Sequence, residues 1–259
     1  MTDLTSRARV SFVGAGPGDP ELVTLKALRR VREADAIIHD RLIPKELLDE
    51  APGGAEIFDV GKVPGRPCIG QGQINGLIVE AARRHRRVVR LKGGDPGIFG
   101  RLAEEIGAVR AAGIPFEIVP GVTAATAAAA YAGISLTERG AASTVVLCTG
   151  TAHTGGVPEA LDWGFLSRVE GTLVFYMPVA SLDAITATLT ALGRDPREPA
   201  VVVEAAGRPD ERVVAARLGA IAARAHDEGV RSPALFISGP TVAAASVPLA
   251  VRRVLAAAG

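Results

Sequence analysis

The sequence predicts an α/β fold built as two α/β domains. In the first half of the 259-residue chain, short β-branched runs alternate with amphipathic helical patterns, which is typical of parallel strands joined by helical crossovers. In the second half, residues 200–218 read as two strands joined by a Gly-Arg-Pro-Asp turn, an antiparallel hairpin. We therefore expect a parallel-rich N-terminal sheet (residues 1–122) and a mixed C-terminal sheet (residues 123–259).

Hydrophobic periodicity assigns the elements of the first half. Strands are expected at 9–14, 35–40, 56–60, 88–94 and 116–121, and helices at 20–34, 72–87 and 102–112. Asp19 is the expected N-cap of the first helix and Pro20 its first residue. One face of that helix is predicted to carry Leu22, Leu25, Leu28 and Val31.

The second half begins with an alanine-rich helical stretch at 124–134, which interrupts the strand rhythm and places the domain boundary. Strands are expected at 143–150, 171–177, 200–206, 211–218 and 233–239, with helices at 181–193 and 218–229.

Charge and composition exclude several classes of protein. The formal net charge is +1, from 29 Lys and Arg against 28 Asp and Glu, and only 4% of the residues are aromatic. We therefore expect no nucleic-acid partner, because neither a bulk positive charge nor a stacking platform is present. The four histidines show no metal-ligand spacing, so no metal site is predicted.

The expected location is the cytoplasm. The two cysteines, Cys68 and Cys148, form neither a disulfide framework nor a CxxC pair, which indicates a reduced compartment. No apolar segment typical of a signal peptide precedes Arg7, and the most apolar stretch, 124–134, is too short to span a bilayer. No membrane partner is expected.

The first strand leads into a glycine-rich loop, VSFVGAGPGDPEL at residues 10–22. A dinucleotide fingerprint requires G-x-G-x-x-G, but here the third glycine is replaced by Asp19. An aspartate at this place would repel a pyrophosphate at the helix N-terminus. The loop sequence therefore argues against binding of a nicotinamide dinucleotide. Two interpretations remain: a tight turn that binds no ligand, or a turn that binds a ligand with little or no phosphate.

A second glycine loop, KGGDPGIFGR at residues 92–101, repeats the Gly-Asp-Pro sequence after another strand. Asp95 in this loop has a carboxylate that accepts hydrogen bonds from hydroxyl or amino groups. A third turn of small residues contains Thr123 and Ala124. Because ligands collect at the carboxyl edge of parallel sheets, we expect the loops to meet there around a ligand.

Basic residues fall into two groups. Arg83, Arg84, Arg86 and Arg87 flank His85 at a predicted helix C-terminus, where a solvated helix end favoured by the helix dipole is the simpler interpretation. The second group is scattered over loops, where site residues concentrate, and suits a small polyanion. Its members are Arg41, Lys62, Arg66, Arg101 and Arg139.

These motifs resemble the tetrapyrrole methyltransferase family, and within it the uroporphyrinogen-III C-methyltransferases. The segments VGAGPGDPELVTLKA, HDRL, RVVRLKGGDPGIFGR, IPFEIVPGVTAA, YAGISLTERG and SPALFISG occur in the family's order, from residue 9 to about 248. The resemblance implies S-adenosylmethionine in a cleft between two α/β domains of a homodimer. It implies methylation of uroporphyrinogen III at carbons 2 and 7, giving precorrin-2 by way of precorrin-1, without a metal.

The resemblance also implies roles for individual residues. The N-terminal domain supplies the glycine loops and the tetrapyrrole side, and the C-terminal domain completes the cofactor site. Cofactor contacts are expected from Pro17, Gly93, Gly94, Asp95, Ile98, Thr123, Ala124, Met177, Ala206 and Ala234. Catalytic roles are expected for Asp40, Lys62 and Arg101, with Asp40 the first candidate base, and substrate contacts for Arg41, Glu104 and Arg139.

Other interpretations remain open. Without the resemblance, the simpler interpretations are Asp40 as a cap of the next helix, Lys62 as a surface lysine and Met177 as a core residue. Methylation of a later precorrin, or binding of the cofactor or tetrapyrrole without catalysis, are the rival functions. Departures from the family pattern cluster on the tetrapyrrole side and leave the acceptor, its regiochemistry and the end product (sirohaem, cobalamin or haem d1) open. They are His39, Gly97, Leu102, Ala103 and Glu138.

Overall fold

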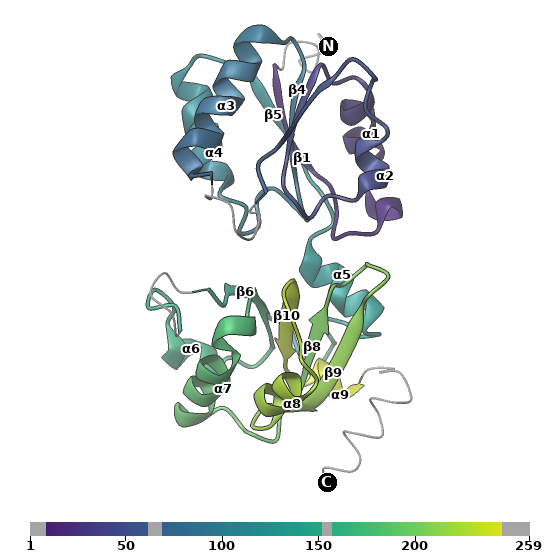
Figure 1. The fold of residues 1–259 in the computed structure, drawn as a ribbon. Helices are drawn as coiled ribbons and strands as arrows, with labels where there is room; N and C mark the ends of the chain where they lie inside the picture. The colour runs from purple at the N-terminus through teal and green to yellow at the C-terminus, as the bar shows by residue number, and fades with distance from the viewer. Residues whose placement is uncertain (1–8, 62–68, 152–156, 245–259) are drawn as a thin grey trace. The chain divides into compact units, whose positions relative to one another are not determined.

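The computed structural model describes residues 9–61, 69–151 and 157–244 (Figure 1). The chain divides into two compact units between Ala124 and Ala125. Each unit contains one five-stranded sheet, parallel in unit 1 and mixed in unit 2. The predicted fold class, two α/β sheets of these two kinds, is confirmed. The expectation of a cofactor cleft between the two halves stays a prediction.

The sheet of unit 1 has the strand order β3-β2-β4-β1-β5, and every neighbouring pair is parallel. Its strands are β1 (Val10–Gly14), β2 (Ala36–His39), β3 (Glu56–Asp59), β4 (Val88–Lys92) and β5 (Phe116–Val119). Its helices are α1 (Leu25–Arg32), α2 (Lys45–Leu48), α3 (Gln71–Arg84) and α4 (Leu102–Ala111). All carboxyl ends of the strands therefore lie along one edge.

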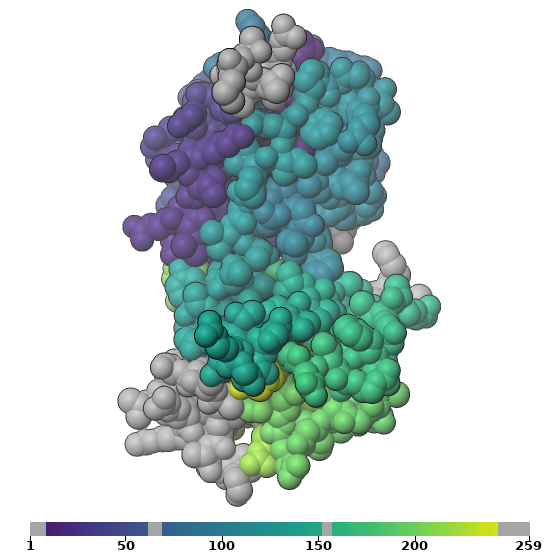
Figure 2. All heavy atoms as spheres, turned by 180° about the vertical axis from the view of Figure 1, so that it is seen from behind, coloured from purple at the N-terminus to yellow at the C-terminus, as the bar shows by residue number. Residues whose placement is uncertain are grey.

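Helices cover both faces of this sheet, so unit 1 has three layers (Figure 1). Successive side chains of β1 point to opposite faces: Phe12 packs in the core with Ile78 of α3, and Val13 packs in the core with Val31 of α1. Seen from behind, the edge strand β5 runs along the surface between the purple α1 layer and the blue α3 and α4 layer (Figure 2). Both faces of the central strands β1, β2 and β4 are buried, which explains why their sequences are mostly apolar and do not alternate with exposed polar residues.

The first helix begins later than the sequence predicts. Asp19 caps only a short 3₁₀ turn, Pro20–Leu22, in which its side chain accepts a hydrogen bond from the amide of Glu21. Helix α1 starts at Leu25, after a new N-cap, Thr24. The predicted apolar face is wrong at Leu25, the first residue of α1, which is 82% exposed, whereas Ala27 and Val31 are the residues of this helix that are buried.

The sheet of unit 2 has the order β6-β7-β10-β8-β9. Its strands are β6 (Val145–Thr149), β7 (Thr172–Tyr176), β8 (Pro199–Glu204), β9 (Arg212–Arg217) and β10 (Ala234–Ser238). Its helices are α5 (Ala124–Tyr131), α6 (Trp163–Arg168), α7 (Leu182–Ala191), α8 (Ile221–Asp227) and α9 (Thr241–Ala244), of which α5 begins at the last residue of unit 1. Strands β8 and β9 pair antiparallel, which confirms the predicted hairpin.

An aromatic stack lies in the core of unit 2. The ring of Phe175 is 6.0 Å from that of Trp163 and 5.8 Å from that of Phe236, both in stacked orientation. Ile185 of α7 and Ile221 of α8 are buried in the same cluster, so these helices cover this face of the sheet. Among the helices that the structure describes, none has both the length and the apolar character needed to cross a membrane.

Three turns of unit 1 touch one another through their backbones at the carboxyl edge. The loop after β1 pairs with the loop after β4, because the amide of Gly94 donates to the carbonyl of Gly16 at 2.7 Å and the amide of Gly16 donates to that of Gly94 at 3.3 Å. A Cβ on Gly14 would lie 2.6 Å from Gly121 and 2.7 Å from the Gly94 oxygen. Contact between main chains requires glycine at Gly14 and Gly121, whereas Gly94 is favoured as glycine by its positive φ of 66°.

Gly121→Ala is expected to lower the free energy of unfolding by about 3 kcal/mol, since a new methyl meets backbone atoms of Gly94 and Gly14 that have no rotamer to change. Urea unfolding of the full chain measures this. Gly107→Ala in α4 is the matched control: a Cβ there meets nothing within 4 Å, and alanine is expected to raise stability by about 0.5–1 kcal/mol. Equal effects of the two changes would contradict the close approach.

Candidate functional site

Most of the predicted ligand residues of unit 1 lie in the loops at the carboxyl edge of its sheet. Pro17 follows β1, Gly93 and Ile98 follow β4, and Thr123 follows β5. The strands β4, β1 and β5 are neighbours in the sheet, and β5 is its edge strand. All four are partly accessible in the structure. The loops meet as the sequence analysis expects, while the contacts of these residues with a cofactor stay a prediction.

Asp95 holds two of these loops together. Its Oδ1 accepts a hydrogen bond from the amide of Gly97 at 2.7 Å, and its Oδ2 accepts one from the amide of Gly121 at 3.0 Å. From the sequence, this carboxylate is expected to accept hydrogen bonds from a ligand. The structure shows both of its oxygens engaged by the backbone, so any ligand contact would be added to a structural role.

The predicted ligand residues of unit 2 share one edge of the second sheet. Met177 follows the end of β7, Ala206 follows the end of β8, and Ala234 begins β10, which runs antiparallel to both strands. The register pairs Ala234 with Glu204, and Leu235 with Tyr176. The three residues are therefore gathered from segments far apart in the sequence. Met177 is 47% exposed, so its interpretation as a core residue is wrong.

Left-handed backbone conformations mark the same loops. In the described ranges, the non-glycine residues with positive φ are Phe99, Arg101, Met177 and Ala205, with φ between 51° and 55°. Such conformations are uncommon outside glycine and cluster at ligand sites. Two of them, Phe99 and Ala205, were not among the predicted site residues, because no residue type in the sequence signals a positive φ there.

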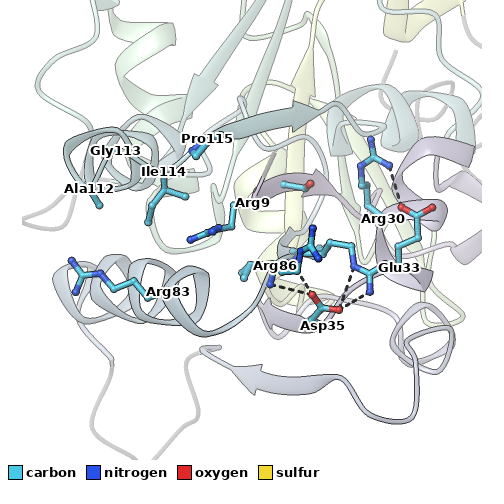
Figure 3. Close-up of a pocket in the computed structure, with 14 residues that line it drawn as sticks. Arg9, Arg30, Glu33, Asp35, Arg83, Arg86, Ala112, Gly113, Ile114 and Pro115 are labelled. Atoms are coloured by element: carbon cyan, nitrogen blue, oxygen red, sulfur yellow. Dashed lines mark hydrogen bonds and ion pairs between the residues drawn. The ribbon is translucent and has the colours of Figure 1, made fainter. Parts of the chain in front are cut away.

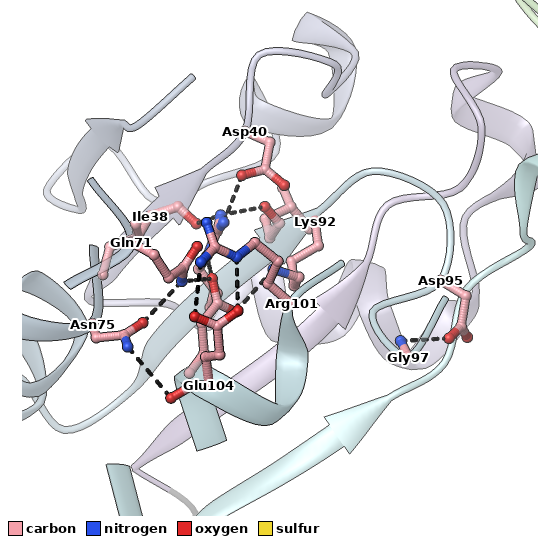
Figure 4. A network of polar contacts seen from close by, with 12 residues as sticks. Ile38, Asp40, Gln71, Asn75, Lys92, Asp95, Gly97, Arg101 and Glu104 are labelled. Carbon is pink, nitrogen blue, oxygen red and sulfur yellow. Dashed lines mark hydrogen bonds and ion pairs between the residues drawn. The ribbon is translucent and has the colours of Figure 1, made fainter. Parts of the chain in front are cut away.

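Asp40 lies at the end of β2 and belongs to an ion network (Figure 4). Its Oδ1 accepts a hydrogen bond from Nη2 of Arg90 at 2.5 Å, and its side chain is 34% exposed. Helix α2, the next along the chain, has Pro44 at its N-cap and no side-chain cap. The interpretation of Asp40 as a helix cap is therefore wrong.

The rest of the network is buried. Nε of Arg90 donates to Oε1 of Glu105 at 2.9 Å, and Nζ of Lys92 donates to Oε2 of the same carboxylate at 2.8 Å. Arg90 also donates to the carbonyl of Leu91, and these three charged side chains are at most 4% exposed. Two cations thus face the two carboxylates of Glu105 and Asp40. Burial, with the neighbouring Arg90, holds the pKa of Lys92 below its ordinary value despite Glu105.

Sequence reasoning did not find Arg90, Lys92 or Glu105 as a group. A weak signal exists, because Arg90 and Lys92 stand two apart in a strand whose other residues are apolar, and so share one face. Glu105 lies in the first turn of α4, and acidic residues are common in the first turn of helices because they are favourable near the positive end of the helix dipole. Its type and position therefore give no sign of a buried ion pair. Nothing local shows that the helix turns this carboxylate toward the strand.

The predicted substrate residues are partly brought together. Arg101 and Glu104 bind each other on the exposed start of α4, at 2.7 and 2.8 Å. Arg41 is exposed beside Gly61, where a Cβ would strike its backbone. Arg139 is exposed and belongs to unit 2, whereas Arg41, Arg101 and Glu104 belong to unit 1. That Arg139 acts together with them stays a prediction. Lys62 lies outside the described residues.

A model of the tetrapyrrole (corrin/porphyrin) methylases matches residues 9–222 of this chain. Among curated proteins, a siroheme synthase of Gluconacetobacter diazotrophicus is 46% identical over 233 residues, which are 90% of this chain and 49% of that protein. A siroheme synthase of Methylococcus capsulatus is 44% identical over 233 residues, 90% of this chain and 49% of that protein. The chain therefore spans about half the length of the curated relatives it matches.

Solved structures show the same likeness. A uroporphyrin-III C-methyl transferase of Thermus thermophilus, complexed with S-adenosyl homocysteine, has a TM-score of 0.78 and 44% identity, covering 92% of this chain and 100% of that one. A cobalt precorrin-4 methyltransferase has a TM-score of 0.81 and 29% identity, covering 90% of this chain and 95% of that one.

Glu105→Gln is expected to lower the free energy of unfolding by about 3–5 kcal/mol, because it leaves Arg90 and Lys92 buried with one carboxylate fewer. Denaturant titration of the full chain gives this value. Glu104→Gln, the adjacent residue in an exposed ion pair with Arg101, is the control and should change stability little, since solvent screens that pair. A loss for Glu105→Gln no larger than the control's would show that the buried charges do not need each other.

Proposed function

Because this chain belongs to the tetrapyrrole (corrin/porphyrin) methylase family, we propose that it is an S-adenosylmethionine-dependent C-methyltransferase. The proposed substrate is uroporphyrinogen III, methylated at carbons 2 and 7 to give precorrin-2 by way of precorrin-1. The observation that carries this proposal is the likeness, over 92% of this chain and 100% of the other, to the uroporphyrin-III C-methyl transferase whose complex contains S-adenosyl homocysteine.

The carboxyl edge of unit 1 suits a cofactor without phosphate. A pyrophosphate site normally offers a free cation or free amides, but Lys92, the lysine that ends β4, has its ammonium bound to Glu105 at 2.8 Å. The amides of Gly94, Gly97 and Gly121 already donate to protein oxygens. S-adenosylmethionine carries a sulfonium, an ammonium and one carboxylate but no phosphate, so it presents less negative charge to this edge than a pyrophosphate does.

S-adenosylmethionine supplies the methyl group as an electrophile on its sulfonium. The protein's task is then to hold an electron-rich pyrrole carbon in line with the carbon–sulfur bond, at near-attack distance. We propose that residues of both units bind the cofactor: Pro17, Gly93, Gly94, Asp95, Ile98, Thr123, Ala124, Met177, Ala206 and Ala234.

Asp40 is the proposed base. After a methyl group joins the ring carbon, the macrocycle carries positive charge and must lose a proton. Asp40 combines a carboxylate oxygen fixed by Arg90 with a side chain that is 34% exposed. In the described part of the chain, its second oxygen meets no donor, and so is available to a ring N–H or C–H.

Arginines are proposed to bind the substrate's carboxylates. Arg101, Arg41 and Arg139 are exposed guanidinium groups, which pair with carboxylates in a bidentate manner. The hydrogen bond to Glu104 raises the pKa of Arg101 above its ordinary value. Arg101 therefore stays protonated, and is better suited to binding a carboxylate than to transferring a proton. Glu104 then orients Arg101, and Lys62 stays a proposed participant in proton transfer. The family resemblance further leads us to propose a cytoplasmic homodimer.

Methylation of a later precorrin is the second candidate. The TM-score of 0.81 to a cobalt precorrin-4 methyltransferase favours it, because this value exceeds that of the uroporphyrin-III enzyme. The identities point the other way, at 29% against 44%. Sequence identity counts matching residue types, including those that line a site, whereas the TM-score compares only the backbone, so uroporphyrinogen III remains the first proposal.

Incubation with uroporphyrinogen III and methyl-labelled S-adenosylmethionine, in the absence of oxygen, is expected to add two methyl groups to each macrocycle. Mass spectrometry of the product counts them. Label entering only a later precorrin would replace the proposed substrate by the second candidate. Tight binding of S-adenosylhomocysteine with no transfer to any tetrapyrrole would indicate a binding protein instead of an enzyme.

Asp40→Asn is expected to lower kcat about 100-fold or more, since an amide still accepts the hydrogen bond of Arg90 but takes up no proton. The affinity for S-adenosylhomocysteine, measured by calorimetry, should stay within twofold. Asp49→Asn, an exposed carboxylate of the same unit, is the control and should retain full turnover. Unchanged turnover of Asp40→Asn would refute the assignment of the base.

A further inference from the structure

A hollow lies at the amino edge of the unit 1 sheet, where its strands begin (Figure 3). Its volume is about 980 Å³. Arg9 immediately precedes β1, Asp35 precedes β2, Arg87 precedes β4 and Pro115 precedes β5, and all four line it. The proposed methyl-transfer site uses the carboxyl ends of the same strands, so this hollow is a separate place on the molecule.

Positive charge dominates its lining. The guanidinium groups are those of Arg9, Arg30, Arg83, Arg86 and Arg87, against the carboxylates of Glu33 and Asp35. The acids are already engaged. Asp35 accepts from Nη2 of Arg87 at 2.7 Å and from the amides of Arg86 and Arg87, and the bond from Arg87 holds the pKa of Asp35 below its ordinary value. Glu33 pairs with Arg30 at 3.4 Å.

Three guanidinium groups of the lining have no carboxylate partner in the described ranges. Arg9 donates from Nη1 to the carbonyl of Ala82 at 3.2 Å, and the side chains of Arg83 and Arg86 are exposed. Like charges around one hollow repel each other, and a bound anion would relieve this repulsion.

Helix dipoles do not explain the arrangement. A cation at the C-terminus of a helix is favourable, which accounts for Arg83 in the last turn of α3. Arg86, however, stands beyond the end of that helix, and Arg9 precedes a strand. The helix dipole therefore explains the position of Arg83 but not those of Arg86 and Arg9.

The lining also restricts the chemistry of a ligand. No aromatic side chain lines the hollow among the described residues, so a nucleobase finds no stacking surface there. Guanidinium groups bind oxyanions through paired N–H donors. We propose that this hollow binds a small, multiply charged oxyanion, an oligophosphate or a polycarboxylate, at a site distinct from the methyl-transfer site.

Calorimetric titration of the full chain at low ionic strength tests the proposal, with tripolyphosphate and citrate as the two probes. At least one is expected to bind with one site per chain. In Arg83→Gln/Arg86→Gln, the Kd of that probe is expected to rise at least tenfold. Both side chains are exposed, so this variant should fold, and its melting temperature without probe should match that of the parent. The probe that binds assigns the site to phosphates or to carboxylates.

Two control variants separate this site from general attraction. Arg29→Gln/Arg231→Gln removes the same charge from two exposed arginines that do not line the hollow, and Arg41→Gln changes the carboxyl edge. Both should alter the Kd less than twofold. Failure of both probes to bind, an equal loss in the charge-matched control, or a loss confined to Arg41→Gln would each overturn the proposal. None of these readouts depends on methyltransferase activity.

Discussion

The contact between three main-chain turns at the carboxyl edge is the constraint on which unit 1 depends. Gly14 and Gly121 approach each other and the carbonyl of Gly94 so closely that neither has room for a Cβ, and paired amides and carbonyls of Gly16 and Gly94 close the contact. Asp95 adds a side-chain link to the same assembly. Loops held in this way are ordered before any ligand arrives, and a site built from them does not lose binding energy to ordering.

Beside this edge, a balanced set of charges connects the strands to α4. Arg90 and Lys92 are buried against Glu105, and the network reaches solvent through Asp40. Burying charge is costly unless each member is paired, so the groups hold one another in defined positions. The proposed base is therefore oriented from inside the protein, by side chains that are buried away from solvent.

The two edges of the same sheet differ in their electrostatics. At the carboxyl edge the charges of β4 are matched by carboxylates, which suits a cofactor without phosphate. At the amino edge, Arg9, Arg83 and Arg86 have no acidic partner among the described residues, which suits an anion. One scaffold of parallel strands thus offers two chemically distinct places, and the proposals for them are independent.

Local pattern was sufficient for the strands, the hairpin of β8 and β9 and the glycine loops, because side-chain periodicity and the freedom of glycine act over a few residues. It failed at the first helix, where Asp19 is the expected N-cap but caps only a 3₁₀ turn, and α1 begins after Thr24 instead. The partners of Arg90 were decided by tertiary structure alone: Glu105 and Asp40 stand 15 and 50 positions away. Pairings of buried charges follow from which elements become neighbours, and no local pattern records that.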